Sequence, residues 1–285
     1  MAKVYLNGRY VPSTEACLPI TDRGLLFGDS IYEVVPVYQG TPFQAEAHLA
    51  RLQRGLEAIR LPNPLDTAAW LAIIQTLSQQ TPTLDQGIYI QVTRGAYPER
   101  AHRIPDNPQP NVFAFSKLLN KPDPNIKIQG LHAITRPDLR WQHCDLKTTN
   151  LLPNILALTE AQEQGADDAI LVREGIAREG TSSNLFAILN GVLTTPPDNT
   201  EILPGVTRNL VLQLAKTIGL PCSRHNIQAA DLAHASEIWL SSSTREIAPV
   251  TRLNHQAVGE GRPGPIWQQI NRLYQTAKTE LHRVS

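Results

Sequence analysis

The chain of 285 residues is long enough for one large domain or two domains of ordinary size. Its 26 acidic and 26 basic residues balance, so charge gives no argument for nucleic acid or an anionic membrane as a partner. No apolar run approaches the roughly 20 residues that are needed to cross a bilayer. The cysteines Cys17, Cys144 and Cys222 are far apart and odd in number, which argues against a zinc site or a disulfide framework. We therefore expect a cytoplasmic protein without a bound metal.

The first part of the chain predicts two hairpins, two helices and two further strands. The hairpins rest on Asn-Gly and Gln-Gly turns between runs that favour strands. The helices rest on apolar residues at helical spacing. In chain order these elements are the hairpins Lys3–Val11 and Ile31–Phe43, the helices Glu46–Ile59 and Thr67–Ser78, and the strands Gly87–Arg94 and Asn111–Lys117.

The second part follows a stretch with two prolines, residues 118–125, which we interpret as a linker. The predicted strands beyond it are Lys127–Thr135, Ala169–Arg173, the hairpin Asn184–Thr194 and Glu237–Ser241, and the predicted helices are Asn150–Glu163, Thr207–Ile218 and Pro265–Leu281. We therefore predict an N-terminal α/β domain at 1–117 and a C-terminal domain at 126–285. Strands and helices alternate in both halves, so the expected class is α/β or mixed α+β.

Two ionisable residues are the first candidates for chemistry. Lys147 lies between a predicted strand and a predicted helix. A lysine that attacks a carbonyl must be desolvated or lie near other cations, and the sequence alone does not show this, so an ordinary solvated lysine is the alternative. Glu179 precedes a Gly-Thr-Ser-Ser turn. It is either an exposed turn carboxylate or an anion held against the ring nitrogen of a ligand.

Two further segments carry groups that bind anions. Val206 and Thr207 follow Pro204-Gly205 at the start of a predicted helix, where backbone N–H groups and a hydroxyl make an anion site. The alternative is an ordinary helix cap made by Thr207. The hydroxyls of Ser243 and Thr244 end a predicted strand and indicate either a phosphate site or a polar turn.

The order of the motifs is more specific than any one of them. The series is residues 21–29 (TDRGLLFGD), Tyr32-Glu33, residues 48–52 (HLARL), Lys147 with Asn150, residues 179–184 (EGTSSN), residues 203–208 (LPGVTR) and residues 242–247 (SSTREI). This series resembles the class IV, or fold type IV, aminotransferases, which depend on pyridoxal 5'-phosphate (PLP). The resemblance extends from Val4 to about Val250.

The resemblance implies a fold and a set of roles. It implies a two-domain architecture with PLP between the domains, and a homodimer in which a loop of one subunit reaches the other's site. Lys147 would form the Schiff base with PLP and later move the substrate proton. Glu179 would keep the pyridine nitrogen protonated, and Leu203 would pack on the ring. The implied phosphate cradle is Arg51, Val206, Thr207, Ser243 and Thr244, with the choice between the last two hydroxyls left open.

One loop bears on the substrate. Arg100 and His102 are two residues apart, so in an extended loop their side chains point the same way and suit one carboxylate. On spacing alone they are a solvated basic loop beside Arg103. Together with Tyr32, they resemble the carboxylate-binding residues of D-amino-acid transaminases. This branch implies amino transfer between a D-amino acid, such as D-alanine or D-glutamate, and 2-oxoglutarate or pyruvate.

Some residues depart from that branch, and alternatives stay open. Ser30 stands where glycine is expected, Thr148-Thr149 where Ser-Leu is expected, and Ser243 where threonine is common. The same family also includes branched-chain aminotransferases, R-selective amine transaminases and aminodeoxychorismate lyases. A PLP-binding carrier or regulatory protein without turnover is the alternative of another class.

Overall fold

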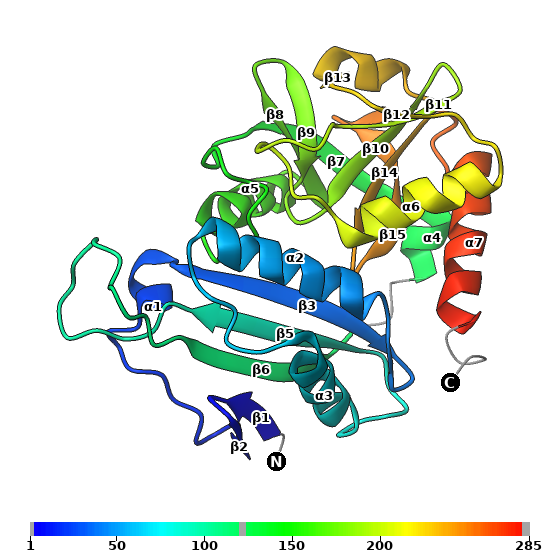
Figure 1. Cartoon of the computed structure of the whole chain (residues 1–285). Helices are drawn as coiled ribbons and strands as arrows, with labels where there is room; N and C mark the ends of the chain where they lie inside the picture. The colour runs from blue at the N-terminus through cyan, green and yellow to red at the C-terminus, as the bar shows by residue number, and fades with distance from the viewer. Residues whose placement is uncertain (1–2, 120–123, 281–285) are drawn as a thin grey trace. The chain divides into compact units, whose positions relative to one another are not determined.

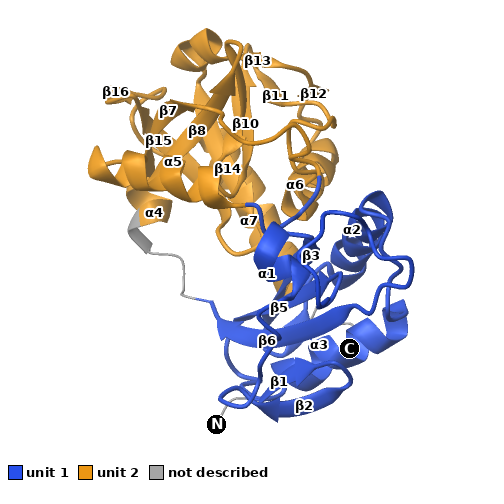
Figure 2. Ribbon diagram, turned by 90° about the vertical axis from the view of Figure 1, so that its left-hand side faces the viewer, with its two compact units in different colours: residues 1–120, 146–150 blue, residues 121–145, 151–285 orange. Residues whose placement is uncertain are grey.

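The computed structural model describes residues 3–119 and 124–280. The chain divides into two compact units, unit 1 with residues 1–120 and 146–150, and unit 2 with residues 121–145 and 151–285 (Figure 1, Figure 2). The predicted linker 118–125 lies partly outside the described residues. Residues 146–150, which include Lys147, group with the N-terminal unit.

In the described part of unit 1, a six-stranded sheet has the order β2-β1-β6-β5-β3-β4, and every pairing is antiparallel. The predicted hairpins are confirmed as β1–β2 and β3–β4. The strands are β1 (Lys3–Leu6), β2 (Arg9–Pro12), β3 (Ser30–Tyr38), β4 (Thr41–Pro42), β5 (Gln86–Thr93) and β6 (Asn111–Leu118).

Two helices, α2 (Ala45–Ala58) and α3 (Thr67–Ser78), build the apolar core of unit 1 against this sheet (Figure 1). Leu52 of α2 and Ile74 of α3 are fully buried in this core. Residues two apart on β3 face the same side, so Glu33 lies on the same face as the core residues of that strand. The sequence therefore places a carboxylate inside an otherwise apolar layer.

The short helix α1 (Arg23–Phe27) was not predicted, because a single turn carries no periodic signal. Asp22 caps its start by accepting a hydrogen bond from the Gly24 amide, and Gly28 ends it with φ 66°. A side chain at residue 28 would collide with the amide of Asn150. Only glycine satisfies both the backbone angle and this close approach.

Residues 146–150 return to unit 1 as an extended segment beside β3. The Tyr32 amide donates a hydrogen bond of 3.0 Å to the carbonyl of Lys147, and Ile31 forms a β-bridge with Thr148. Asn150 belongs to this segment, so the helix predicted from Asn150 begins two residues later, as α5 (Leu152–Glu163). Lys147 is thereby fixed against the first residues of β3.

In unit 2, the described strands form a ten-stranded sheet in which β10-β14-β15-β7-β8-β9 closes on itself, because Glu179 of β9 pairs with Asn184 of β10. The strands are β7 (Leu131–Pro137), β8 (Asp168–Arg173), β9 (Ile176–Gly180), β10 (Asn184–Leu189), β11 (Val192–Thr195), β12 (Cys222–Arg224), β13 (Ile227–Gln228), β14 (Glu237–Ser242), β15 (Glu246–Leu253) and β16 (Gln256–Ala257). The closure brings the ends of β9 and β10 together.

The helices of unit 2 are α4 (Pro124–Gln129), α5, α6 (Val206–Thr217), the 3-10 helix η1 (Ala229–His234) and α7 (Pro265–Glu280). The prediction of a strand from Lys127 was wrong for its first residues. Ile126 and Ile128 alternate as in a strand, but they lie in α4, which Gly130 ends at φ 76° before β7 begins. Mixed α/β architecture is confirmed in both units. Within the described ranges, no helix has the length and apolar character needed to span a membrane.

Candidate active site

The side chain of Lys147 lies against an aromatic stack in unit 1. Its Nζ atom is 4.2 Å from the ring centroid of Tyr32, where the ring face attracts an ammonium group. Tyr32 stacks in turn on Tyr89, with ring centroids 5.4 Å apart and planes 19° apart. Lys147 is half-buried. The predicted attachment lysine and the predicted substrate residue Tyr32 are therefore direct neighbours.

A chain of hydrogen bonds joins the same stack to the Lys147 segment. The Tyr89 hydroxyl donates to Gln91 Oε1 at 2.7 Å, and Gln91 Nε2 donates to Ser30 Oγ at 3.1 Å. Ser30 Oγ and Thr149 Oγ1 are 2.9 Å apart. Ser30 and Thr149, which both depart from the D-amino-acid transaminase pattern, are thus within hydrogen-bond distance of each other. The series of contacts begins at Lys147 and ends at Thr149, two residues further along the same segment. Sequence reasoning missed Tyr89 and Gln91, because cross-strand partners are distant in sequence.

Arg51 of α2 binds a buried carboxylate. Its Nε and Nη2 atoms donate to the two oxygens of Glu33 at 2.6 and 2.9 Å, and His48 Nδ1 lies 2.8 Å from Glu33 Oε2. Burial alone would raise the pKa of Glu33, but the charge of Arg51 and the bond to His48 hold it well below its usual range. Burial lowers the pKa of His48, and the charges of Arg51 and Lys147 lower it further. The guanidinium of Arg51 is thus held rigidly by a permanent anion.

The side chains of Arg100 and His102 both contact the ring of Phe27, at the end of α1. The guanidinium carbon of Arg100 lies 5.1 Å from the ring centroid, and the His102 ring centroid lies 5.4 Å away in an edge-on geometry. Both side chains remain exposed. Tyr32, the third predicted member of the carboxylate site, lies in the separate stack with Tyr89.

In unit 2, the carboxylate of Glu179 is buried where β9 pairs with β10 and closes the sheet. It accepts hydrogen bonds from Arg140 Nη1, from Asn184 Nδ2 at 3.0 Å, and from the Leu203 amide at 3.2 and 3.3 Å to its two oxygens. Asn184 also donates to the carbonyl of Leu203 at 2.7 Å. Burial raises the pKa of Glu179, and Arg140 offsets this only in part.

Arg140 was not singled out from the sequence as a site residue. Its guanidinium is divided between Glu179 and the buried Asp138, whose two oxygens each accept a bond of 2.9 Å from it. Arg173 lies 3.2 Å from Asp138 as well. The only sequence signal was its place seven residues before Lys147. Without the fold, nothing linked it to Glu179.

The loop before α6 and the start of α6 present backbone amides. The N-cap of α6 is Gly205, which has no side chain to cap the first amides, so the alternative in which Thr207 is the cap is wrong. A side chain at residue 205 would collide with the Asn184 amide, which explains the glycine. Val206 and Thr207 are the first two residues of the helix and are buried, and Leu203 is half-buried.

The turn between β14 and β15 carries Ser243, which is half-buried, and Thr244, which is exposed. Its neighbour Arg245 pairs with the buried Asp168, which also accepts a bond of 2.6 Å from the Thr181 hydroxyl. Asp168 thus ties the turn to the segment that follows Glu179. The choice between Ser243 and Thr244 as a phosphate ligand stays open.

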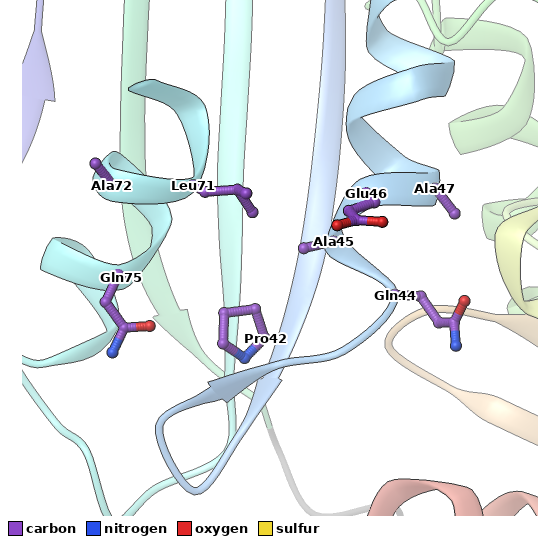
Figure 3. Close-up of a pocket in the computed structure, with 8 residues that line it drawn as sticks. All are labelled: Pro42, Gln44, Ala45, Glu46, Ala47, Leu71, Ala72 and Gln75. Carbon is purple, nitrogen blue, oxygen red and sulfur yellow. The ribbon is translucent and has the colours of Figure 1, made fainter. Parts of the chain in front are cut away.

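An open hollow in unit 1 lies between the start of α2 and α3 (Figure 3). Its lining combines the small or apolar side chains of Pro42, Ala45 and Leu71 with the polar Glu46 and Gln75. None of the predicted site residues is in this lining. We assign it no role in the chemistry.

Comparison with known proteins defines the class. The profile of the amino-transferase class IV family matches residues 30–253, which is most of the chain. The chain therefore belongs to the class IV aminotransferases, a PLP-dependent family with the fold type IV architecture. The resemblance inferred from the order of the motifs is confirmed.

Particular relatives extend over nearly the whole chain. The D-alanine aminotransferase of Bacillus licheniformis is 38% identical over 283 residues, with 97% of this chain and 99% of the relative covered. The solved branched-chain aminotransferase of Thermoproteus uzoniensis has a TM-score of 0.86 at 27% identity, with 96% of this chain and 93% of that one covered. The branched-chain aminotransferase of Escherichia coli has a TM-score of 0.87 at 24% identity over the same shares of the two chains, which bears on the fold alone.

The described residues fit PLP by their chemistry. The amine of Lys147 suits the cofactor's aldehyde, and the buried carboxylate of Glu179 suits the N–H of a pyridinium ring. The uncapped amides of α6 and the hydroxyls of Ser243 and Thr244 suit a phosphate dianion. The hydroxyl of Ser183, four residues after Glu179, is buried without a hydrogen-bond partner among the described residues. Unit 2 therefore also has a polar group near Glu179 that is available to a ligand.

Proposed function

We propose that this protein is a D-amino-acid transaminase, with D-alanine or D-glutamate as the amino donor and 2-oxoglutarate or pyruvate as the acceptor. The observation that carries the proposal is the guanidinium–imidazole pair of Arg100 and His102, held together on Phe27. It provides charge-assisted donors for one carboxylate. The names of relatives such as the Bacillus licheniformis D-alanine aminotransferase support the same substrate class.

We assign the reaction to Lys147 and Glu179. PLP, when bound, supplies an electron-withdrawing ring that stabilises the negative charge left on the substrate Cα after its proton is removed. Lys147 is proposed as the lysine to which the cofactor attaches, and its released amine takes the proton from Cα and returns one during transfer. Glu179 would keep the ring nitrogen protonated by accepting its N–H as an anion, and the guanidinium of Arg140 beside it favours that charged form.

The phosphate is assigned to cationic and backbone groups. Arg51, held by Glu33, supplies a fixed positive charge. The amides of Val206 and Thr207 at the start of α6 add the positive end of the helix dipole. Ser243 and Thr244 complete this set with hydroxyl groups, and Leu203 is assigned to one face of the ring.

The stereochemical preference follows from where the substrate carboxylate is held. Lys147 can move a proton only on its own face of the cofactor. If Arg100, His102 and Tyr32 form the carboxylate side, the Cα–H bond of a D-amino acid points toward Lys147, and that of an L-amino acid points away. We therefore infer turnover of D-substrates with little turnover of L-leucine.

An activity panel tests the substrate class. D-alanine, D-glutamate, L-leucine and (R)-1-phenylethylamine are compared as donors to pyruvate or 2-oxoglutarate, and a D-amino acid is expected to be fastest. The branched-chain relatives of known structure make L-leucine the main competitor. Faster turnover of L-leucine than of any D-amino acid would overturn the proposal. A half-reaction with D-alanine alone, followed by cofactor absorbance, separates an enzyme from a PLP-binding protein without turnover.

Replacement of Arg100 tests the carboxylate site. Arg100→Ala is expected to weaken D-alanine turnover by about 2–5 kcal/mol, if the bound carboxylate is otherwise buried and unpaired. The same change should have little effect on (R)-1-phenylethylamine, which has no carboxylate. Normal D-alanine kinetics in this variant would return the loop to an ordinary solvated turn.

We also propose a homodimer, in line with the family, in which the loop of Arg100 and His102 serves the partner's site. Size-exclusion chromatography with light scattering measures this state.

A cytoplasmic location is proposed from the three cysteines, all of which are free thiols. Burial raises the pKa of the Cys144 thiol to about 11, which makes it unreactive at neutral pH.

A further inference from the structure

The loop that carries Arg100 and His102 is held by a residue of α1. Arg23, the first residue of that helix, is buried, with 8% of its side chain exposed. Its Nη1 atom donates to the carbonyl of Ala101 at 2.5 Å, and its Nη2 atom donates to the carbonyl of His102 at 3.4 Å. One guanidinium therefore binds two consecutive carbonyl groups of the loop.

Phe27 lies one helical turn after Arg23, so the two side chains share a face of α1. The guanidinium carbon of Arg23 lies 4.9 Å from the Phe27 ring centroid, and that of Arg100 lies 5.1 Å from it. The edge-on contact of His102 is made with the same ring. Arg23 thus holds the backbone of the loop, while Phe27 contacts its two functional side chains.

Arg23 is itself fixed from the other side by Asp29. Its Nε atom donates to Asp29 Oδ2 at 2.9 Å, and Arg94 Nε donates to the same oxygen at 2.8 Å. Burial would raise the pKa of Asp29, but the bonds from Arg94 and Arg23 outweigh it and lower that pKa. Arg94 also donates to the carbonyls of Ile59 and Arg60 at 2.6 and 3.2 Å. Through Arg23, Asp29 and Arg94, the loop is therefore linked by hydrogen bonds to the residues that directly follow α2.

We propose that Arg23 and Phe27 are positioning residues for the substrate carboxylate, which act by holding Arg100 and His102 in place. This inference rests on the proposed function of the Arg100–His102 loop. The side chains of Arg100 and His102 are exposed, and free rotation of exposed side chains opposes binding through the entropy lost when they are ordered. The contacts with Phe27 restrict the rotation of these two side chains, and the bonds from Arg23 hold the backbone that carries them, before substrate arrives.

The test compares holoenzyme variants Arg23→Met, Arg23→Lys and Phe27→Leu with the unchanged protein. Arg103→Met is the matched control, because Arg103 lies in the same loop but is exposed and pairs with the exposed Asp106. Arg23→Met is expected to raise KM for D-alanine roughly ten- to a hundredfold, the range for the loss of one charge-assisted hydrogen bond to the carboxylate, with a much smaller change in kcat. Arg23→Lys keeps a charge for Asp29 and should recover part of the loss. Phe27→Leu should show a smaller rise in KM, and Arg103→Met none.

Two further measurements separate positioning from general damage. Hydrogen–deuterium exchange of residues 97–106 should be faster in Arg23→Met and Phe27→Leu than in Arg103→Met. Turnover of (R)-1-phenylethylamine should be unchanged in all of them, because this donor has no carboxylate. Equal losses for D-alanine and the amine in Arg23→Met, Arg23→Lys and Phe27→Leu would overturn the inference, as would a loosened loop with a normal KM for D-alanine.

The Arg100→Ala variant tells the two failures apart. If Arg100→Ala weakens D-alanine turnover while Arg23→Met and Phe27→Leu do not, the inference is wrong and the proposed function stands. If Arg100→Ala leaves D-alanine kinetics normal, the proposed carboxylate site is wrong, and the positioning role falls with it.

Discussion

Two buried glutamates, one in each unit, have pKa values that are shifted in opposite directions, although both pair with arginine. Glu33 of unit 1 has a pKa well below its usual range, whereas the pKa of Glu179 of unit 2 is raised. Both carboxylates are almost fully enclosed, so burial pushes both pKa values upward. The difference therefore comes from their partners.

Both oxygens of Glu33 accept bonds from Arg51, and one of them also bonds His48. Glu179 shares Arg140 with Asp138, whose negative charge raises the pKa of Glu179 further. An arginine that donates to both oxygens of one carboxylate outweighs the cost of burial, whereas Arg140, which is shared with Asp138, does not. The pKa of Glu33 is thus held below its usual value by Arg51 and His48, whereas that of Glu179 stays above its usual value.

The largest expected effect concerns Lys147, whose charge acts on His48, a partner of Glu33. Lys147→Ala should retain weak PLP binding but lower turnover by roughly a thousandfold or more, equal to at least about 4 kcal/mol, because the proposed attachment point and proton carrier are lost. Borohydride reduction and single-turnover kinetics measure this. A borohydride-reducible bond to PLP at normal occupancy in the variant would assign the attachment to another residue.

The second-largest effect tests whether Glu33 stabilises the fold. Glu33→Gln leaves the charge of Arg51 buried without its anion, and the free energy of unfolding should fall by about 3–5 kcal/mol. Urea unfolding followed by tryptophan fluorescence measures the loss. Glu57→Gln is the matched control on α2, because Glu57 is exposed and should change stability by less than about 0.5 kcal/mol. A loss for Glu33→Gln no larger than that of the control would contradict its role as an anchor.

Replacement of Glu179 tests its proposed role at the ring nitrogen of PLP. Glu179→Gln should leave PLP bound and slow the step that removes the Cα proton by roughly 10–150-fold, the equivalent of about 1.5–3 kcal/mol for one charge-assisted hydrogen bond. Stopped-flow single turnovers with D-alanine report this step. Unchanged rates would remove Glu179 from its role at the ring nitrogen.

The smallest effect is a pH dependence with opposite signs for the two glutamates. Because the pKa of Glu33 is lowered on folding, its stabilising contribution is complete above its unfolded value, near 4.5, and is lost in more acidic solution. Because the pKa of Glu179 is raised, its contribution is present below about 4.5 and is lost as pH rises through the folded value. Between pH 4.5 and 7, the destabilisation by Glu33→Gln should therefore stay constant, while that by Glu179→Gln should decrease. Urea unfolding of the PLP-free protein and of both PLP-free variants across this range checks the signs, and parallel pH profiles would refute the comparison.

The elements that the sequence predicted well are those whose signal is local. The helix Thr67–Ser78 has the predicted bounds, because Asp66 caps it and its apolar residues recur at helical spacing. The turn at Asn7-Gly8 formed the predicted hairpin, because both residues adopt positive φ there. The strand predicted from Lys127 was wrong for its first residues, since alternation over a few residues does not distinguish a strand from one helical turn.

The sequence by itself determined the family, since seven motifs in order and the candidates Lys147 and Glu179 were readable without coordinates. Only the tertiary structure decided which partners each functional group has. It joined Lys147 to β3 through Tyr32, divided Arg140 between Asp138 and Glu179, and placed Arg23 beneath the loop of Arg100 and His102. Apart from Asp138 and Arg140, which are two residues apart, these pairings join residues that are distant along the chain. Charge balance, burial and hydrogen bonding act through space, so the proton affinity of a side chain follows from its neighbours in the fold.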